Sequence, residues 1–336
     1  MNHAALPGRP LIQRVYGLLA DRRFHSGTQL ARQCEVRGNA IAQAMAALRE
    51  LGVTVHAVPG RGYCLPSATA PLNIAAIREA LPQEVAVRLR HAATLWSTGS
   101  TNADLLAQSD LAAGRFDFLT AEYQRAGRGR RSRSWFAPPG GAICLSISWS
   151  FQAMPTALSA LSLVVGVCAL RSLKRRDVTR AELKWPNDLL VRGAKLGGIL
   201  TELRVEADGR AFVVIGIGLN VALGSAVLEQ IKANGTQAID LATLGLASIE
   251  RNSMVAALIA EIIPGLVQFE REGFSSFAHE WRAADALAGR AVRVSLEAGS
   301  VSGHARGIDL DGALCVQTSD GIRRFLSGDV SVRAVA

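Results

Sequence analysis

The sequence predicts a multidomain α+β protein with a winged helix-turn-helix over residues 1–66, a mixed β-sheet with helices on one face over residues 67–284, and a small SH3-like β-barrel over residues 285–336. Three observations lead to this fold class. Short helical patterns followed by a strand–turn–strand pattern open the chain. Apolar strands then alternate with longer helices. Beyond Asp285, glycines separate short β-branched runs.

The amino-terminal elements are predicted from apolar spacing and turn residues. The first helix has one apolar face, made by Leu11, Val15, Leu18 and Leu19. Ser26 is a candidate cap for a second helix, and a third helix is expected over residues 39–51. The strands expected at 53–58 and 63–65 flank a Pro-Gly-Arg-Gly turn. This layout is typical of a DNA-binding winged helix with residues 39–51 as recognition helix, and a helical protein-interaction module is the alternative.

A linker is expected over residues 66–71, where Ser, Ala, Thr and Pro gather. The central strands are expected at 118–121, 142–149, 182–184, 198–204 and 212–217. The central helices are expected at 102–107, 155–173, 253–272 and 275–283. The sequence contains no internal repeat.

Composition predicts a soluble protein, because 49% of the residues are hydrophobic and 19% are charged. The apolar run 157–170 is too short for a membrane span, and the amino terminus lacks the layout of a signal peptide. We therefore expect a cytoplasmic protein with no membrane partner. The five cysteines are scattered, and the six histidines show no ligand spacing, so no metal held by protein ligands is expected.

The formal net charge of +9 favours polyanionic partners. Residues 1–66 hold eight arginines against three acidic residues. The second concentration is the arginine loop, residues 124–135, which has five arginines within nine residues. No acidic residue occurs between Glu122 and Asp177. Two separate basic regions suggest two anionic partners.

The arginine loop is expected to be mobile, because its glycines and mutually repelling guanidinium groups favour neither helix nor strand. Glycine backbone N–H groups and forked arginine donors suit phosphate or carboxylate oxygens. Trp135 adds a flat apolar face. A solvated basic loop or a nucleic-acid arm is the alternative.

Lysine is rare here, with only four among 37 basic residues, yet Lys184 and Lys195 lie in one short segment. A compact ammonium suits contact with a single developing charge. Two surface lysines in a hairpin are the alternative.

Three further clusters interrupt the apolar strands. Ser100-Thr101-Asn102 precedes a helix. Its side chains would either cap that helix or hold a polar group of a ligand. The segment Lys184-Trp185-Pro186-Asn187-Asp188 leads to Lys195-Leu196-Gly197-Gly198, whose small residues permit close approach to the backbone. The run Gly216-Ile217-Gly218-Leu219-Asn220 is no dinucleotide fingerprint, because it lacks the third glycine and no helix clearly follows, and the chain has no P-loop.

In this order, the clusters resemble the biotin protein ligases, in particular the bifunctional class that also represses the biotin operon. The amino-terminal Phe24-His25-Ser26-Gly27 and Val58-Pro59-Gly60-Arg61-Gly62-Tyr63 match as well, as does Arg306-Gly307-Ile308-Asp309. The resemblance covers nearly the whole chain. Its most specific parts are the Lys-Trp-Pro-Asn-Asp segment and the arginine loop.

The resemblance implies a two-step reaction with biotin, ATP and Mg²⁺. Biotin and MgATP would give biotinyl-5′-adenylate, and a lysine of the biotin carboxyl carrier protein of acetyl-CoA carboxylase would then accept the biotin. Operator DNA is the second implied partner, and a homodimer is expected when the adenylate is bound.

The resemblance also implies roles for individual residues. Lys195 and Arg130 would be catalytic. Biotin would be bound by Ser100, Thr101, Asn102, Gln124, Gly127, Arg128, Gly129, Arg130, Lys195 and Gly198. ATP would be bound by Arg128, Arg130, Arg133, Trp135, Lys184, Asn187, Asp188, Lys195, Asn220, Arg293 and Arg333. DNA would be contacted by Arg37, Asn39, Gln43 and Arg61.

The chain departs from the family pattern at several positions. Ser132 stands where the arginine loop usually has glycine, Ser134 where a basic residue is common, and Glu35 at a turn that usually has glycine. The recognition helix is poor in side chains that pair with bases. Three alternatives stay open: a lipoate-type acyl-adenylate ligase, a biotin-sensing DNA-binding regulator without effective transfer, and a ligase with a vestigial amino-terminal domain.

Overall fold

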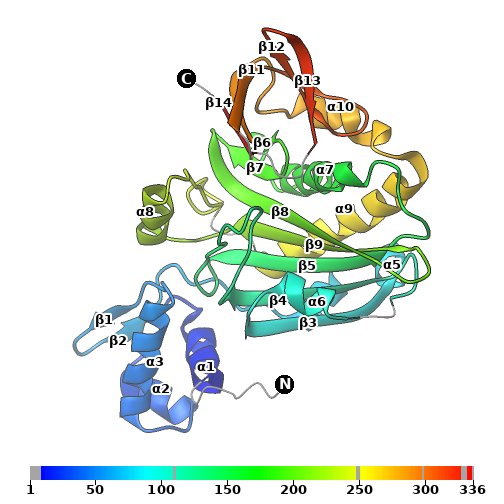
Figure 1. Ribbon diagram of the computed structural model, residues 1–336. Helices are drawn as coiled ribbons and strands as arrows, with labels where there is room; N and C mark the ends of the chain where they lie inside the picture. The colour runs from blue at the N-terminus through cyan, green and yellow to red at the C-terminus, as the bar shows by residue number, and fades with distance from the viewer. Residues whose placement is uncertain (1–8, 109–110, 247–249, 297–298, 327–330, 335–336) are drawn as a thin grey trace.

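The computed structural model describes residues 9–108, 111–246, 250–296, 299–326 and 331–334. Figure 1 shows the amino-terminal helices at one end of the molecule, a large twisted sheet in the middle and a smaller sheet at the other end. This arrangement confirms the predicted multidomain α+β class.

The amino-terminal unit has the predicted three helices and hairpin. Its elements are α1 (Arg9–Leu19), α2 (Gly27–Gln33), α3 (Gly38–Glu50), β1 (His56–Val58) and β2 (Gly62–Cys64). Ser26 caps α2, as predicted, by accepting a hydrogen bond from the N–H of Gln29. The prediction of a strand from residue 53 is wrong, because Val53 bonds back to the carbonyl of Leu48 to close α3, so that β1 starts at His56.

The central sheet has seven strands in the order β3-β4-β5-β9-β8-β7-β6. Only β3 and β4 pair in parallel, so the sheet is mixed as predicted. The strands are β3 (Leu89–Thr98), β4 (Phe116–Gln124), β5 (Ala142–Ser150), β6 (Ala181–Lys184), β7 (Asp188–Val191), β8 (Ala194–Val205) and β9 (Ala211–Asn220). Strand β3 had no counterpart among the predicted elements.

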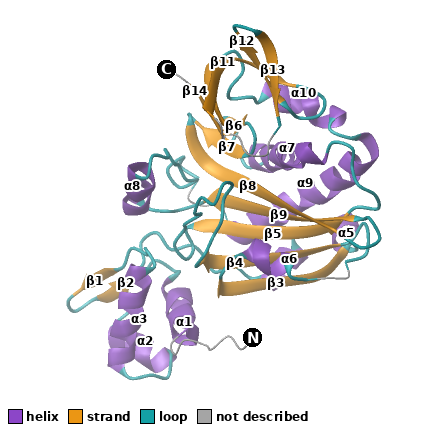
Figure 2. Ribbon diagram, viewed as in Figure 1, coloured by secondary structure: helices purple, strands orange, loops and turns teal. Residues whose placement is uncertain are grey.

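Helices cover the sheet mainly on one face, as Figure 2 shows for α7 and α9. The helices of the central region are α4 (Ile74–Glu79), α5 (Gln83–Ala86), α6 (Thr101–Leu106), α7 (Leu161–Lys174) after a 3₁₀ turn at Leu158–Ala160, α8 (Ser225–Ala233), α9 (Arg251–Glu272) and α10 (Ser275–Ala283). The short α6 lies on the opposite face, where Leu105 packs with Leu119 and Phe212. Helix α8 follows Asn220 closely, contrary to the expectation that no helix does.

Helix α9 is, among the described residues, the one helix that is long and apolar enough to cross a membrane. Most of its apolar side chains, such as Ile259 and Phe269, are buried in the main core. The core packing against α7 and the sheet accounts for its apolar composition.

The carboxy-terminal unit is a five-stranded antiparallel sheet in the order β13-β12-β11-β10-β14. Its strands are β10 (Ala291–Leu296), β11 (Gly299–Ile308), β12 (Leu314–Thr318), β13 (Gly321–Phe325) and β14 (Ser331–Ala334). In the described part of the chain, the end strands β13 and β14 do not pair, so the predicted barrel is not closed. The unit is attached to the central region by Trp185, between β6 and β7, whose indole N–H donates to the carbonyl of Gly312 (3.0 Å).

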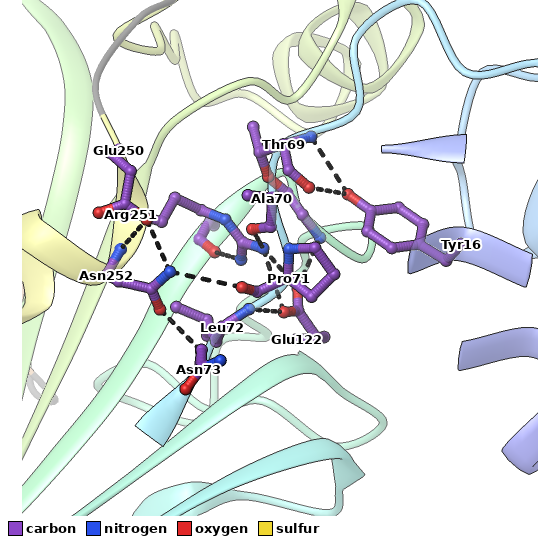
Figure 3. Close-up of polar contacts among 12 residues, drawn as sticks. Tyr16, Thr69, Ala70, Pro71, Leu72, Asn73, Glu122, Glu250, Arg251 and Asn252 are labelled. Atoms are coloured by element: carbon purple, nitrogen blue, oxygen red, sulfur yellow. Dashed lines mark hydrogen bonds and ion pairs between the residues drawn. The ribbon is translucent and has the colours of Figure 1, made fainter. Parts of the chain in front are cut away.

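Residues 69–72, which overlap the linker expected at residues 66–71, form a strap that is bonded to both neighbouring units (Figure 3). The Tyr16 hydroxyl of α1 donates to the carbonyl of Thr69 (3.1 Å) and accepts from its N–H (3.3 Å). Glu122 of β4 accepts from the N–H of Leu72 (2.6 Å), and Arg251 of α9 donates to the carbonyl of Ala70 (2.8 Å). The buried ion pair of Glu122 and Arg251 thus fastens the strap.

An aromatic contact also joins the amino-terminal unit to the sheet. The rings of Tyr16 and Trp96 lie 5.6 Å apart, and Trp96 in turn meets Tyr123 edge-on at 6.0 Å. Gly52, just after α3, lies beside Phe136 and Pro138, since a Cβ added there would be in van der Waals contact with each at 3.5 Å. The amino-terminal unit therefore contacts both strand β3, through Trp96, and the segment that follows the arginine loop.

Candidate active site

The polar end of the candidate site lies where β4 ends and α6 begins. Ser100 is the N-cap of α6, and its hydroxyl accepts from the N–H of Ala103 (3.4 Å). The N–H (2.8 Å) and hydroxyl (3.1 Å) of Thr101 both lie within bonding distance of Oε1 of Gln124. The structure thus brings Ser100, Thr101 and Gln124 together from separate parts of the sequence.

Ser146 and Glu202 complete this polar network, and the sequence analysis selected neither. The Ser146 hydroxyl lies 2.7 Å from Oγ1 of Thr101 and 2.5 Å from Oδ1 of Asn102. The Asn102 amide donates to the carbonyl of Leu200 (3.2 Å) and to Oε2 of Glu202 (2.8 Å). Serines at alternate positions of an otherwise apolar strand were a signal for Ser146. Glu202 has no comparable local signal.

The arginine loop forms a short hairpin, whereas its composition predicted irregular structure. The N–H of Gly129 donates to the carbonyl of Arg133 (2.6 Å), and the N–H of Trp135 donates to that of Gly127 (2.8 Å). Arg131 and Ser132 form the turn with φ angles of 55° and 56°. Left-handed backbone of this kind favours glycine, which explains why a glycine suits position 132.

Arg128 joins this hairpin to the sheet. Its Nη2 lies 3.0 Å from Oε1 and 3.3 Å from Oε2 of Glu202. The Arg128 side chain is 46% exposed and that of Glu202 is 21% exposed. Because Glu202 also accepts from Asn102, one carboxylate connects the hairpin with the first turn of α6.

Glycines of β9 let two side chains of the site contact the sheet backbone. A Cβ added to Gly218 would lie 2.4 Å from Cζ2 of Trp135, and one added to Gly216 would lie 2.3 Å from Oδ1 of Asn102. The indole N–H of Trp135 is buried and has no hydrogen-bond partner among the residues that the structure describes. This is a physical reason for the Gly-Ile-Gly pattern that the sequence analysis did not identify.

Lys195 is paired with a carboxylate from the neighbouring strand. Its Nζ lies 2.6 Å from Oδ1 of Asp188. Asp188 stands opposite Gly198, where an added Cβ would lie 3.2 Å from the Lys195 Nζ. The amides of Asn187 and Asn220 donate to the backbone carbonyls of Ile199 (2.7 Å) and Lys195 (3.2 Å). Both amides therefore brace strand β8 around the lysine.

Lys184 marks a concentration of positive charge. Burial lowers the pKa of Lys184, the nearby Asp188 carboxylate opposes that shift, and the charges of Lys195, Arg333 and Arg133 add to it. These cations come from β6, β8, β14 and the arginine hairpin. Gathering like charges is unfavourable unless an anion compensates them, so this region suits a polyanion.

Arg293 and Arg333 stand directly opposite each other in the β10–β14 pair. Like charges at opposed positions destabilise a sheet, so a bound anion beside them would be stabilising. Arg130 lies at the start of the hairpin turn, where its carbonyl accepts from the N–H of Arg133 (3.3 Å).

The candidate DNA contacts lie on the amino-terminal unit, away from this site. Arg37 is the N-cap of α3 and makes no capping bond with its side chain. Asn39 and Gln43 follow on α3, and Arg61 lies at the hairpin tip, and all four side chains are exposed. The guanidinium of Arg61 stacks on Phe24 at 4.3 Å. Glu35 has a φ of 54°, which accounts for a glycine preference at that turn.

Comparison with protein families assigns a class to each part of the chain. The profile of the HTH domain matches residues 12–64, that of the biotin/lipoate A/B protein ligase family matches residues 95–220, and that of the biotin protein ligase C terminal domain matches residues 288–333. Together with the fold and the site, these matches define a protein of the biotin/lipoate ligase class that carries a helix-turn-helix domain.

Full-length relatives narrow this class. The chain is 36% identical over 321 residues to the bifunctional ligase/repressor BirA of Salmonella typhimurium, covering 95% of this chain and 97% of the relative. It is also 36% identical to the bifunctional ligase/repressor BirA of Escherichia coli, over 96% of this chain and 97% of the relative. This chain therefore belongs to the family of bifunctional ligase/repressor BirA proteins.

A solved structure agrees with the fold. The biotin protein ligase from Aquifex aeolicus in complex with biotin and ATP is similar at a TM-score of 0.60 and 25% identity. The similarity covers 73% of this chain and 100% of that protein.

Proposed function

We propose that this chain activates biotin with ATP and transfers it to a lysine of the biotin carboxyl carrier protein of acetyl-CoA carboxylase. In the first step, a biotin carboxylate oxygen attacks the α-phosphorus of ATP, and the bond to the β-phosphate oxygen breaks to release pyrophosphate. In the second step, the neutral lysine amine attacks the acyl carbon of biotinyl-5′-adenylate. An amide forms, AMP leaves and the amine loses a proton.

Lys195 is the residue proposed to act in the first step. Two anions must approach each other, and an ammonium between them would offset the negative charge that develops on the phosphate. The present Asp188 partner holds the ammonium in place before substrates arrive. Arg128 and Arg130 would close over biotin and the adenylate, and Arg133 would contact the triphosphate.

The remaining substrate contacts follow from the same placement. Ser100, Thr101 and Gln124 would bind the ureido end of biotin, which offers both donors and acceptors. Trp135 and Asn220 would lie near adenine, while Arg293 and Arg333 would extend the basic surface toward the nucleotide. Closure of the hairpin would exclude water and protect the anhydride from hydrolysis.

Mg²⁺ would enter with ATP as part of the substrate. In the described ranges no group of three or more His, Cys, Asp or Glu side chains is placed to hold a metal ion. Phosphate oxygens would supply most of its ligands, because Mg²⁺ is commonly bound through substrate phosphates and few protein carboxylates.

The observation that carries this proposal is the placement of two lysines beside Asp188: Lys184 stands opposite it in the β6–β7 pair, and Lys195 bonds it at 2.6 Å. The polar group of Thr101 and Gln124 lies in the same domain. Biotin is a carboxylic acid with a polar ring at its far end, and that ring matches the polar group. The triphosphate of ATP matches the positive charges.

Mass spectrometry of an acceptor domain incubated with the protein, biotin and MgATP tests the enzyme. One added biotin per acceptor, with pyrophosphate release, is the expected result. Lys195→Ala should abolish most of this activity, whereas Lys174→Ala, a change on the outer surface of α7, should not. Biotin binding with neither product would favour a biotin-sensing regulator, and preferential use of lipoate would favour the lipoate-type ligase.

The repressor half of the proposal depends on the exposed Arg37, Asn39, Gln43 and Arg61. Binding of the protein to its own biotin-gene promoter should weaken with salt, because phosphate contacts release counterions. Biotin plus ATP should tighten this binding. Equal affinity for promoter and unrelated DNA, with or without ligands, would indicate a ligase with a vestigial amino-terminal domain.

The finer organisation is proposed with the function. The DNA-binding unit would be residues 1–66, the biotin- and ATP-binding unit residues 67–284, and the accessory unit residues 285–336. The protein would act in the cytoplasm, apart from membranes, and would form a homodimer when the adenylate is bound. Sedimentation with and without biotin plus ATP would test the dimer.

A further inference from the structure

A continuous chain of hydrogen bonds links the polar end of the site to the arginine hairpin. It passes from Gln124 to Thr101, through the Ser146 hydroxyl to Asn102, and from Asn102 to Glu202. Glu202 ends the chain by bonding Arg128 of the hairpin. Four of these six residues are expected biotin contacts, whereas Glu202 and Ser146 have no assigned role.

We propose that Glu202 is a positioning residue, which holds the arginine hairpin against the polar end of the site through Arg128. The inference rests on the proposed function, in which that hairpin covers biotin and the adenylate. Glu202 itself need not touch either substrate.

The geometry of Glu202 supports this role. Its Oε2 accepts from the Asn102 amide at 2.8 Å, which leaves Oε1 to accept from Arg128 at 3.0 Å. Asn102 is buried and fixed to the sheet by a second bond to the carbonyl of Leu200. The carboxylate is therefore oriented by a rigid neighbour before it receives the guanidinium.

The sequence of the hairpin makes such an anchor useful. Its arginines repel one another, and its turn holds Arg131 and Ser132 in left-handed backbone. A partly buried carboxylate bonded by two guanidinium contacts offsets some of that cost. An ordered hairpin loses less conformational freedom when a ligand binds, which favours affinity without changing the chemical step.

Limited trypsin digestion of the ligand-free protein tests the anchor directly, because trypsin cleaves after arginine. Glu202→Gln keeps the shape and the contact with Asn102 but removes the charge that holds Arg128. Cleavage within residues 125–133 should become about two- to fivefold faster, the range expected for one partly exposed ion pair. Glu206→Gln is the matched control, since Glu206 follows the same strand and bonds Arg204 instead. It should leave hairpin cleavage unchanged.

A second variant separates positioning from general destabilisation. Because Arg128→Ala removes one tryptic site, cleavage is compared after Arg130, Arg131 and Arg133. There Arg128→Ala should speed cleavage by a similar factor, and adding Glu202→Gln to it should give no further increase. Equal cleavage of Glu202→Gln and the unaltered protein would overturn the inference. So would a full additional increase in the double variant, because Glu202 would then act through something other than Arg128.

Steady-state kinetics give a readout that a merely structural change would not produce. Glu202→Gln should raise the KM for biotin about two- to fivefold while kcat stays within about twofold, because the anchor contributes before the ligand binds. A fall in kcat with unchanged KM would contradict positioning. If the cleavage results hold but biotin plus ATP do not protect the hairpin of the unaltered protein, the anchor stands and the proposed ligase function fails.

Discussion

Replacing Arg251 with methionine provides a quantitative test of how the strap is fastened. The guanidinium is fully buried and contacts both carboxylate oxygens of Glu122 at 2.8 and 3.1 Å, together with the carbonyls of Ala70 (2.8 Å) and Ala142 (3.3 Å). Without Arg251, the Glu122 carboxylate would keep only the N–H groups of Leu72 and Gly140 as partners among these contacts. Removing one partner of a buried ion pair costs about 3–5 kcal/mol in the free energy of unfolding.

Urea unfolding followed by tryptophan fluorescence is the suitable assay. All five tryptophans lie between residues 96 and 281, so the signal reports mainly on the central region. Arg271→Met is the matched control, because Arg271 is 74% exposed although it also pairs with a glutamate, Glu272, which is 36% exposed. Its loss should change the unfolding free energy by less than about 1 kcal/mol.

A loss of stability in Arg251→Met no larger than that in Arg271→Met would contradict the role assigned to the buried ion pair. A second comparison examines the cause of the loss. Adding Glu122→Gln to Arg251→Met removes the unpaired charge, so the double variant should be more stable than Arg251→Met alone. A double variant whose losses simply add would show that the two side chains act independently.

Four further outcomes are expected. Lys195→Ala should lower the rate of pyrophosphate release about 100- to 1000-fold at saturating substrates, the range for one electrostatic donor to a transition state, whereas Lys174→Ala should not. Ser132→Gly should relieve up to about 1 kcal/mol of left-handed strain and slow trypsin cleavage of the ligand-free hairpin, and faster cleavage would contradict this. Burial raises the pKa of Asp285 to about 6, so its contribution to folding is present below pH about 4 and is lost as pH rises through about 6. Asp285→Asn should therefore flatten this part of the pH profile of urea unfolding, and an unchanged profile would exclude the assignment. Arg61→Ala should reduce the salt slope of promoter binding by about one, and an unaltered slope would remove Arg61 from the phosphate contacts.

Elements with strong local patterns were predictable from the sequence. Helix α10 spans the predicted residues 275–283, and β5 begins at the predicted residue 142. Both combine a clear apolar period with a turn beside it. Strand β3 escaped because most of its side chains are only partly buried, which gives no sharp alternation between apolar and polar residues.

The residues of the candidate site were predictable where they belong to short motifs. Contacts between residues that are distant in the sequence were not predictable. Thr101 and Gln124 each belong to a short motif, and they lie together in the fold. Arg251 is 129 positions from its partner Glu122, and Glu202 is 74 positions from Arg128. No local pattern indicates such contacts, because each residue looks like an ordinary member of an amphipathic element. The hairpin was missed because backbone bonds across its turn outweigh the low strand propensity of its arginines and glycines.

The strap at residues 69–72 limits how freely the two activities can be separated by cutting the gene. A fragment that begins at Asn73 would lack the Ala70 carbonyl and the Leu72 N–H, so a buried cation and a buried anion would each lose a backbone partner. A fragment that begins near residue 67 would retain both. A DNA-binding domain taken from another protein would also need a tyrosine at the position of Tyr16, because the Tyr16 hydroxyl bonds both the N–H and the carbonyl of Thr69. Chimaeric proteins should therefore be joined at a position before the strap.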